Sequence, residues 1–169
     1  MTHQEAPAGP AKLWRDLTID QRLALSQALW ADTDSVPQQI EAVQLIARQL
    51  RFRPQSVLSQ PIEKRVRQLA HLSQVSEGIA NRALVVYHLE TQRPMLEKFL
   101  DALGIPHQEG MITESTSAPP DEAALRSAAL ALAGEFPLES VRLYLRTLAA
   151  QDAETWRPLA AIATELPAS

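Results

Sequence analysis

The chain has 169 residues, of which 46% are hydrophobic and 21% are charged, and it contains no cysteine. This composition favours a globular chain over a disordered one, and it excludes disulfides, thiol nucleophiles and zinc held by cysteine. The net charge of −4 disfavours a general surface for nucleic acids or anionic membranes, and the acidity lies in residues 111–169, which carry four basic and eight acidic side chains.

Two helices with the same start signal are expected after a flexible tail over residues 1–10. Thr18 and Gln21 have the spacing of a capping box, in which a hydroxyl and a glutamine side chain bond reciprocally to free backbone N–H groups. Ser35 and Gln38 repeat this spacing. Apolar residues at helical spacing follow both signals. In the second helix, the residues expected to be buried are Ile40, Val43, Ala47 and Leu50.

A third helix is expected to begin at Pro61, because proline suits the first turn of a helix. Its inward residues are expected to be Ile62, Val66 and Leu69. Glu63 and Arg67 are four positions apart on the other side of this helix, and this spacing favours an ion pair.

The sequence has one basic cluster, which flanks the connector at residues 54–60. It consists of Arg48, Arg51, Arg53, Lys64, Arg65 and Arg67. A helix-turn-helix protein would use a basic second helix of this kind, but the connector is longer than the usual turn of about three or four residues. Glu63 and the acidic net charge also oppose nucleic-acid binding. The cluster is therefore expected to be a solvated helix face.

The most apolar part of the sequence runs from Ser76 to Gly104. Ser76 is a suitable N-cap, and a helix that is apolar on nearly all sides is normally buried. Residues 83–89 would also suit a strand, because the run is short and rich in valine. A lone strand leaves its backbone unpaired, and no second strand is evident, so a helix is favoured. Pro94 is expected to end it and to begin another helix at a bend.

The helix after Pro94 has the clearest stop signal in the chain. Gly104 is expected to adopt a left-handed conformation at the end of the helix, and Ile105 to fold back onto its last turn. Pro106 prevents the helix from continuing. Residues 113–120, rich in Ser, Thr and Pro, are expected to form a mobile loop.

The last part of the chain predicts a helical hairpin and a final helix over residues 121–166. The complete pattern predicts an all-α fold without a sheet, as a single compact domain of seven or eight helices in a bundle or an irregular array of helical hairpins. This domain is expected to span residues 11–169, with the main helical core at residues 11–112.

The sequence carries no motif of a familiar catalyst. Its five glycines are isolated, so they build no phosphate-binding loop and no nucleophile elbow. No catalytic residue and no cofactor is predicted. His88 with Glu90, and His107 with Glu109, are possible metal ligands. Residues two apart on a helix point about 200° from each other, so the first pair cannot share an ion, whereas the second pair lies in a loop and could converge. The simpler interpretation, a partly buried His88 satisfied by a neighbour and His107 in a turn near the surface, is favoured, and no metal site is predicted.

A small-ligand or anion-binding pocket is a second hypothesis. Tyr87, His88 and Arg93 flank the bend at Pro94, and the guanidinium group of arginine binds carboxylates and phosphates. His107 and Glu109 would add polar groups from the following loop. The simpler alternative is that His88 and Tyr87 belong to the core and that Arg93 pairs with Glu97.

The leading functional hypothesis is a non-enzymatic helical module that binds a protein partner or itself. The residues expected at its interface are Leu130, Leu143 and Tyr144, which lie off the expected core stripes of the C-terminal hairpin. The pocket hypothesis and an enzyme of unrecognised type are the alternatives. Nucleic acid is not expected as a partner because of the charge balance, and a membrane is not expected because, in addition, no apolar run approaches the roughly 20 residues that span a bilayer. A cytoplasmic location is expected.

Overall fold

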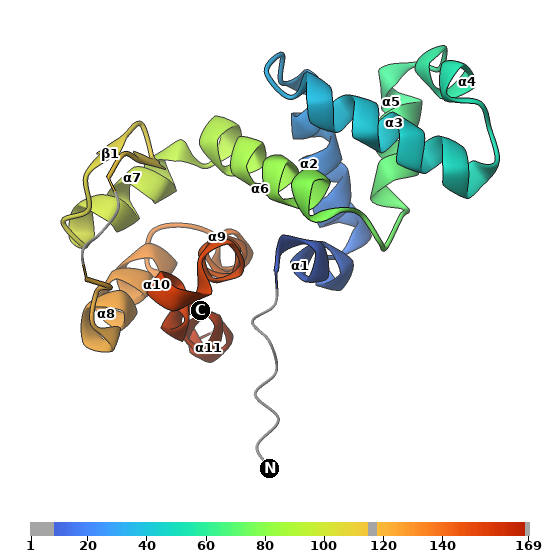
Figure 1. Ribbon diagram of the computed structural model, residues 1–169. Helices are drawn as coiled ribbons and strands as arrows, with labels where there is room; N and C mark the ends of the chain where they lie inside the picture. Colours follow the sequence, from blue (N-terminus) through green and yellow to red (C-terminus); the bar gives the residue numbers. More distant parts are fainter. Residues whose placement is uncertain (1–8, 115–117, 168–169) are drawn as a thin grey trace. The chain divides into compact units, whose positions relative to one another are not determined.

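The computed structural model describes residues 9–114 and 118–167, so most of the expected tail and residues 115–117 of the expected loop lie outside the described residues. The described residues confirm the all-α class, with eleven helices and one very small sheet (Figure 1). The expectation of no sheet is wrong at this one place. Strands β1 (His107–Gln108) and β2 (Met111–Ile112) pair antiparallel around Glu109 and Gly110, whose positive φ angles of 53° and 90° suit a tight hairpin turn.

Contacts divide the chain into two units, Gly9–Tyr87 and His88–Ser169, called here the N-terminal and C-terminal units. The division falls inside helix α6 (Glu77–Thr91), not in the loop at residues 113–120. A single domain over residues 11–169 stays a prediction, as does the mobility of the loop. No helix among the described residues is long and apolar enough to cross a membrane.

The N-terminal unit is built from helical pairs, in which α2 packs against α5 and α3 packs against α4. The capping box at Thr18 and Gln21 is confirmed, because both reciprocal hydrogen bonds are present. The helices of this unit, before α6, are α1 (Pro10–Asp16), α2 (Ile19–Ala31), α3 (Val36–Leu50), α4 (Pro54–Leu58) and α5 (Ile62–Ala70).

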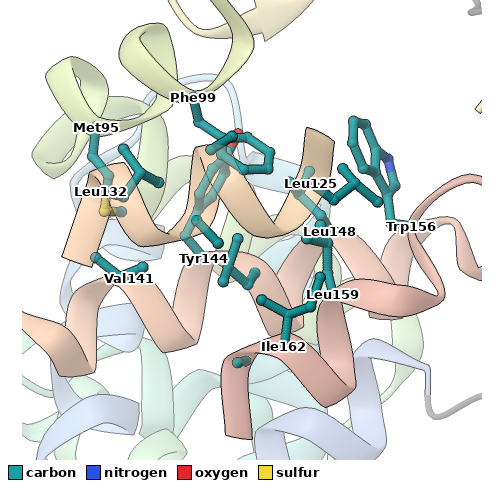
Figure 2. Packing of buried hydrophobic residues seen from close by; sticks show 14 of the residues in the cluster. Met95, Phe99, Leu125, Leu132, Val141, Tyr144, Leu148, Trp156, Leu159 and Ile162 are labelled. Atoms are coloured by element: carbon teal, nitrogen blue, oxygen red, sulfur yellow. The ribbon is translucent and has the colours of Figure 1, made fainter. Parts of the chain in front are cut away.

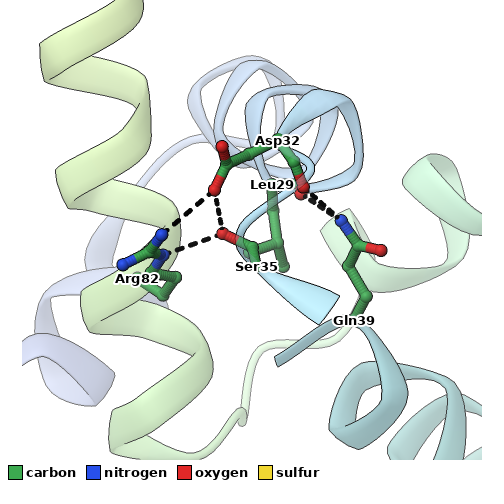
Figure 3. A network of polar contacts seen from close by, with 5 residues as sticks. All are labelled: Leu29, Asp32, Ser35, Gln39 and Arg82. Atoms are coloured by element: carbon green, nitrogen blue, oxygen red, sulfur yellow. Dashed lines mark hydrogen bonds and ion pairs between the residues drawn. The ribbon is translucent and has the colours of Figure 1, made fainter. Parts of the chain in front are cut away.

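A polar network joins the turn between α2 and α3 to α6 (Figure 3). The Arg82 Nε atom donates to the Ser35 hydroxyl at 2.8 Å, and that hydroxyl donates to the Asp32 carboxylate. Gln39 Nε2 donates to the backbone carbonyls of Leu29 and Asp32, at 2.9 and 2.8 Å. The expected capping box at Ser35 is wrong, since its side chain serves this network and makes no cap hydrogen bond.

Only the middle of the apolar stripe on α3 is buried. Val43 and Ala47 are buried as expected, but Ile40 and Leu50 are 52% and 41% exposed. The buried face of α3 consists of Ala42, Val43, Ile46 and Ala47, and Leu50 is the last residue of the helix, directly before the turn at Arg51. Ile62 was also expected to be buried and is instead 49% exposed, at the first residue of α5.

The C-terminal unit surrounds one apolar cluster (Figure 2). Phe99 of α7, Leu132 of α8, Tyr144 of α9 and Leu159 of α11 all contribute to it. Helices α8 and α9 form the expected hairpin, and the Asp121 side chain caps α8 by accepting from Ala124 N. The helices of this unit are α7 (Arg93–Ala102), α8 (Glu122–Ala133), α9 (Leu138–Gln151), α10 (Ala153–Trp156) and α11 (Pro158–Glu165).

The two local signals of the most apolar stretch, the helix start at Ser76 and the helix stop at Gly104, are confirmed. Residues 83–89 lie within helix α6, and the Ser76 hydroxyl accepts from Ile79 N near its start, so the strand alternative is excluded. Gly104 has a φ of 67°, and Ile105 N donates to Leu100 O at 2.9 Å. Ile105 folds back into the apolar cluster, as the helix stop predicted.

Candidate interaction site

His88 is a core residue of the C-terminal unit. Its Nε2 atom lies 3.0 Å from the hydroxyl oxygen of Thr147, and that hydroxyl donates to Leu143 O. The Thr147 oxygen therefore accepts from Nε2–H of the neutral ring. Burial removes the water that would stabilise the charged ring and lowers the pKa of His88 to about 3. A neutral, enclosed imidazole gives no positive charge for an anion.

Arg93 and Glu109, two residues of the pocket hypothesis, form an ion pair with each other. An Nη atom of Arg93 lies 3.6 Å from the Glu109 carboxylate, and its Nε donates to Leu89 O. The expected alternative partner, Glu97, forms no ion pair with Arg93 among the described residues. Both side chains are well exposed, so their pair contributes at most about 1 kcal/mol. Tyr87 is half-buried and lies in the other unit, so a pocket shared with it stays a prediction.

Both ring nitrogens of His107 are occupied. Its Nε2 lies 2.7 Å from Asp101 Oδ1, and its Nδ1 accepts from Gly110 N at 3.2 Å. This arrangement leaves no ring lone pair for a metal ion. Within the described ranges, no three His, Asp or Glu side chains form a group that would hold a metal.

The residues expected at an interface have different environments. Leu130 is 48% exposed on α8, in agreement with its expected position. Leu143 and Tyr144 are buried, so they do not form the exposed apolar edge that the helical projection suggested. The Tyr144 ring packs edge-on against the rings of Phe99 and His88, and its burial raises its pKa. An interface role for Leu130 stays a prediction.

The segment from the end of α3 into α5, residues 48–67, concentrates exposed apolar side chains, and we call it the joint. Four large ones lie within thirteen residues, and exposed apolar groups that gather in one region can mark an interaction site. Nine large apolar side chains are exposed in the described part of the chain, so the joint holds nearly half of them. Those of the joint are Leu50, Phe52, Leu58 and Ile62, with exposed fractions of 41%, 48%, 53% and 49%.

The backbone turns sharply at the joint, and this turn leaves the apolar side chains on the surface. Arg51 ends α3 in the left-handed conformation, with a φ of 56°. The following Phe52 N donates back to Ala47 O at 2.9 Å. Pro54 then begins α4, in which Val57 is buried and the adjacent Leu58 is exposed. The buried residue holds α4 in place, so its neighbour points away from the core.

The basic side chains of the joint are not neutralised within the chain. In the ranges that the structure describes, its six arginine and lysine residues make no ion pair, and the expected Glu63–Arg67 pair is absent. In the C-terminal unit, four of the six basic residues, Arg93, Lys98, Arg126 and Arg142, pair with carboxylates, whereas the exposed Arg146 and Arg157 pair with no described residue. Five of the six basic residues, all except the half-buried Arg65, are exposed together with apolar side chains, a combination that sequence reasoning missed because exposure is not encoded locally.

Comparison with known proteins identifies no relative. The chain matches no protein-family model, no curated protein and no solved structure. Its function must therefore be inferred from the geometry and the charge of the joint.

Proposed function

We propose that the chain is a non-enzymatic helical module that binds another protein chain through the joint. The observation that carries this proposal is the exposure of Leu50, Phe52, Leu58 and Ile62 within one short segment. Exposing such side chains to water is unfavourable, by about 25 cal/mol for each Å² of apolar surface. A partner that covers them would recover this free energy. Apolar and aromatic groups surrounded by polar ones are also the usual composition of protein interfaces.

The backbone at Arg51 supports the same site. A non-glycine residue in the left-handed conformation costs roughly 1 kcal/mol, and such strain gathers at functional sites. Glycine would make the same turn without this cost. An arginine side chain at this place is explained if its charge is used for binding.

Photo-cross-linking in cells that express the chain tests the proposal. A photoreactive amino acid replaces Leu58 in the joint, Leu130 on α8 or Gln27 on α2, one at a time. All three side chains are exposed, so each replacement is expected to leave the fold intact. Gln27 serves as the control, because it lies outside the joint. The products are identified by mass spectrometry.

The expected result is one dominant protein product from the Leu58 position that is absent from the Gln27 position. A product from Leu130 alone would place the contact on α8 and overturn the assignment to the joint. Equal products from all three positions, or no protein product, would contradict the proposal.

A further inference from the structure

We infer that the partner presents an acidic amphipathic segment, in which carboxylates flank apolar side chains, and that this segment docks on the joint. This inference rests on the proposed function and specifies the chemistry of the partner. It follows from the charge of the joint, where six basic residues accompany a single acidic one, Glu63. The exposed apolar residues lie between and beside these charges in the sequence, so a matching segment must offer both kinds of group.

The basic residues of the joint are available to a partner because they form no ion pairs with described residues. An arginine that already pairs with a carboxylate gains little from a second one, whereas an unpaired arginine gains charge-assisted hydrogen bonds. None of the six basic residues of the joint forms an ion pair with any other described residue. Arg51, Arg53 and Arg67 are exposed and therefore accessible to carboxylates of a partner.

A second copy of the chain is a less suitable source of these carboxylates. The C-terminal unit is acidic, but most of its carboxylates already have partners within the unit. Two of them, Asp121 and Asp152, cap helices. Asp101 is hydrogen-bonded to His107, and those that form ion pairs are Glu109, Glu122, Glu135, Glu139 and Glu165.

Nucleic acid and membrane fit the joint less well than a peptide does. Single-stranded nucleic acids need aromatic platforms for their bases, and Phe52 is the one aromatic residue in the joint. A membrane surface binds long amphipathic helices with a free apolar face. Helix α4 has five residues, and α5 buries Val66 and Leu69 within the N-terminal unit.

The test uses the full chain and three synthetic helical peptides of about 18 residues, which is about five helical turns. The first peptide has leucine at helical spacing and glutamate on both sides. In the second, lysine replaces glutamate, and in the third, serine replaces leucine. Binding is measured by fluorescence anisotropy of labelled peptide. The expected result is that the first peptide binds at least about tenfold more tightly than either of the others.

A matched pair of double variants assigns this binding to the joint. Arg51→Gly with Arg67→Gln removes two charges from the joint, and Arg146→Gln with Arg157→Gln removes two exposed charges from the C-terminal unit. The joint variant is expected to bind the acidic peptide about tenfold more weakly, and the control variant to bind it as the wild type does. Thermal melts of both variants show whether the fold is intact. If both double variants bind the acidic peptide equally weakly, the inference is overturned.

Two further probes separate this inference from its competitors. Tighter binding of a short single-stranded DNA, or of vesicles containing phosphatidylserine, than of the acidic peptide would overturn it. If the acidic peptide does not bind while the photoreactive group at Leu58 still cross-links to a protein, the inferred chemistry of the partner is wrong but the proposed function stands. If both experiments fail, the proposed function fails as well.

Discussion

An Nη atom of Arg82 lies 3.1 Å from the Asp32 carboxylate, fifty positions earlier in the sequence, and this ion pair connects α6 to the turn between α2 and α3. The carboxylate also accepts from the Ser35 hydroxyl. The hydrogen bond from Ser35 and the neighbouring Arg82 guanidinium lower the pKa of Asp32, against the opposing effect of partial burial. Folding therefore stabilises the charged form of Asp32.

Asp32→Asn is expected to lower the free energy of unfolding by about 1–2 kcal/mol at pH 7, because it removes a charged acceptor from two donors. A lowered pKa in the folded state means that this stability is present above the pKa of unfolded aspartate, about 3.9, and is lost as the pH falls below it. The difference from the wild type should therefore shrink below pH 4. Urea melts measure it, and the control is Asp34→Asn, which changes an exposed side chain and leaves the Asp34 backbone in place. A constant difference at all pH values would contradict the role of the ion pair.

His88 should make the stability of the chain fall in mild acid. The buried ring stays neutral down to about pH 3, whereas the unfolded chain takes up a proton near pH 6.5. The contribution of His88 to the free energy of unfolding is therefore fully present above pH 6.5. It should fall by about 2 kcal/mol by pH 5, at 1.36 kcal/mol for each pH unit.

The variant His88→Gln has no imidazole to protonate. Its stability at pH 7 should be lower than that of the wild type, since the glutamine fits the core less well. Its decline between pH 7 and pH 5 should be smaller, as measured by chemical denaturation at each pH. His71→Gln, at an exposed position, should keep the decline of the wild type. The same decline in wild type and His88→Gln would show that the buried histidine is not its source.

Gly104→Val should destabilise the C-terminal unit by at least about 1 kcal/mol, because a β-branched residue resists the left-handed conformation. A Cβ atom at this position meets no other atom within 4 Å, so the cost arises from the backbone and not from a clash. Gly104→Asn should cost less than Gly104→Val, since asparagine tolerates this conformation better. Denaturant melts that rank the two variants equally would mean that the φ of 67° does not determine the cost.

Arg51→Gly should raise the free energy of unfolding by up to about 1 kcal/mol, because glycine adopts the left-handed conformation without strain. Part of this gain is offset, since glycine makes the unfolded chain more flexible. The control is Gln49→Gly, at an exposed position inside α3, where glycine should lower stability. Destabilisation by Arg51→Gly would contradict the proposed strain, and with it the argument for a functional arginine at this turn.

The elements that the sequence predicted correctly are those with a local cause. The capping box at Thr18, the helix stop at Gly104 and the break at Pro94 depend on a few adjacent residues, and all three are present. The capping box expected at Ser35 failed because Arg82, far away in the sequence, binds the same hydroxyl. Local spacing gives no information about such a competitor.

Exposure was the main property that the sequence did not predict. Leu50 belongs to an apolar stripe with helical spacing, but it is the last residue of α3 and is exposed there, which the spacing alone does not reveal. Tyr144 lies off the predicted core stripe of α9 but is enclosed by Phe99 and His88 from other helices. The sequence therefore showed the joint as a basic cluster, while two of its four exposed apolar residues, Leu50 and Ile62, were assigned to the core.

Hydrogen–deuterium exchange tests the central claim most directly, in a complex of the chain with the protein that cross-links to Leu58. If the joint is the contact surface, amide exchange should slow within residues 48–67 when the partner is bound, while exchange in α8 should stay unchanged. Slowed exchange confined to α8, around the exposed Leu130, or no change within residues 48–67, would contradict the claim that this chain binds its partner through the joint.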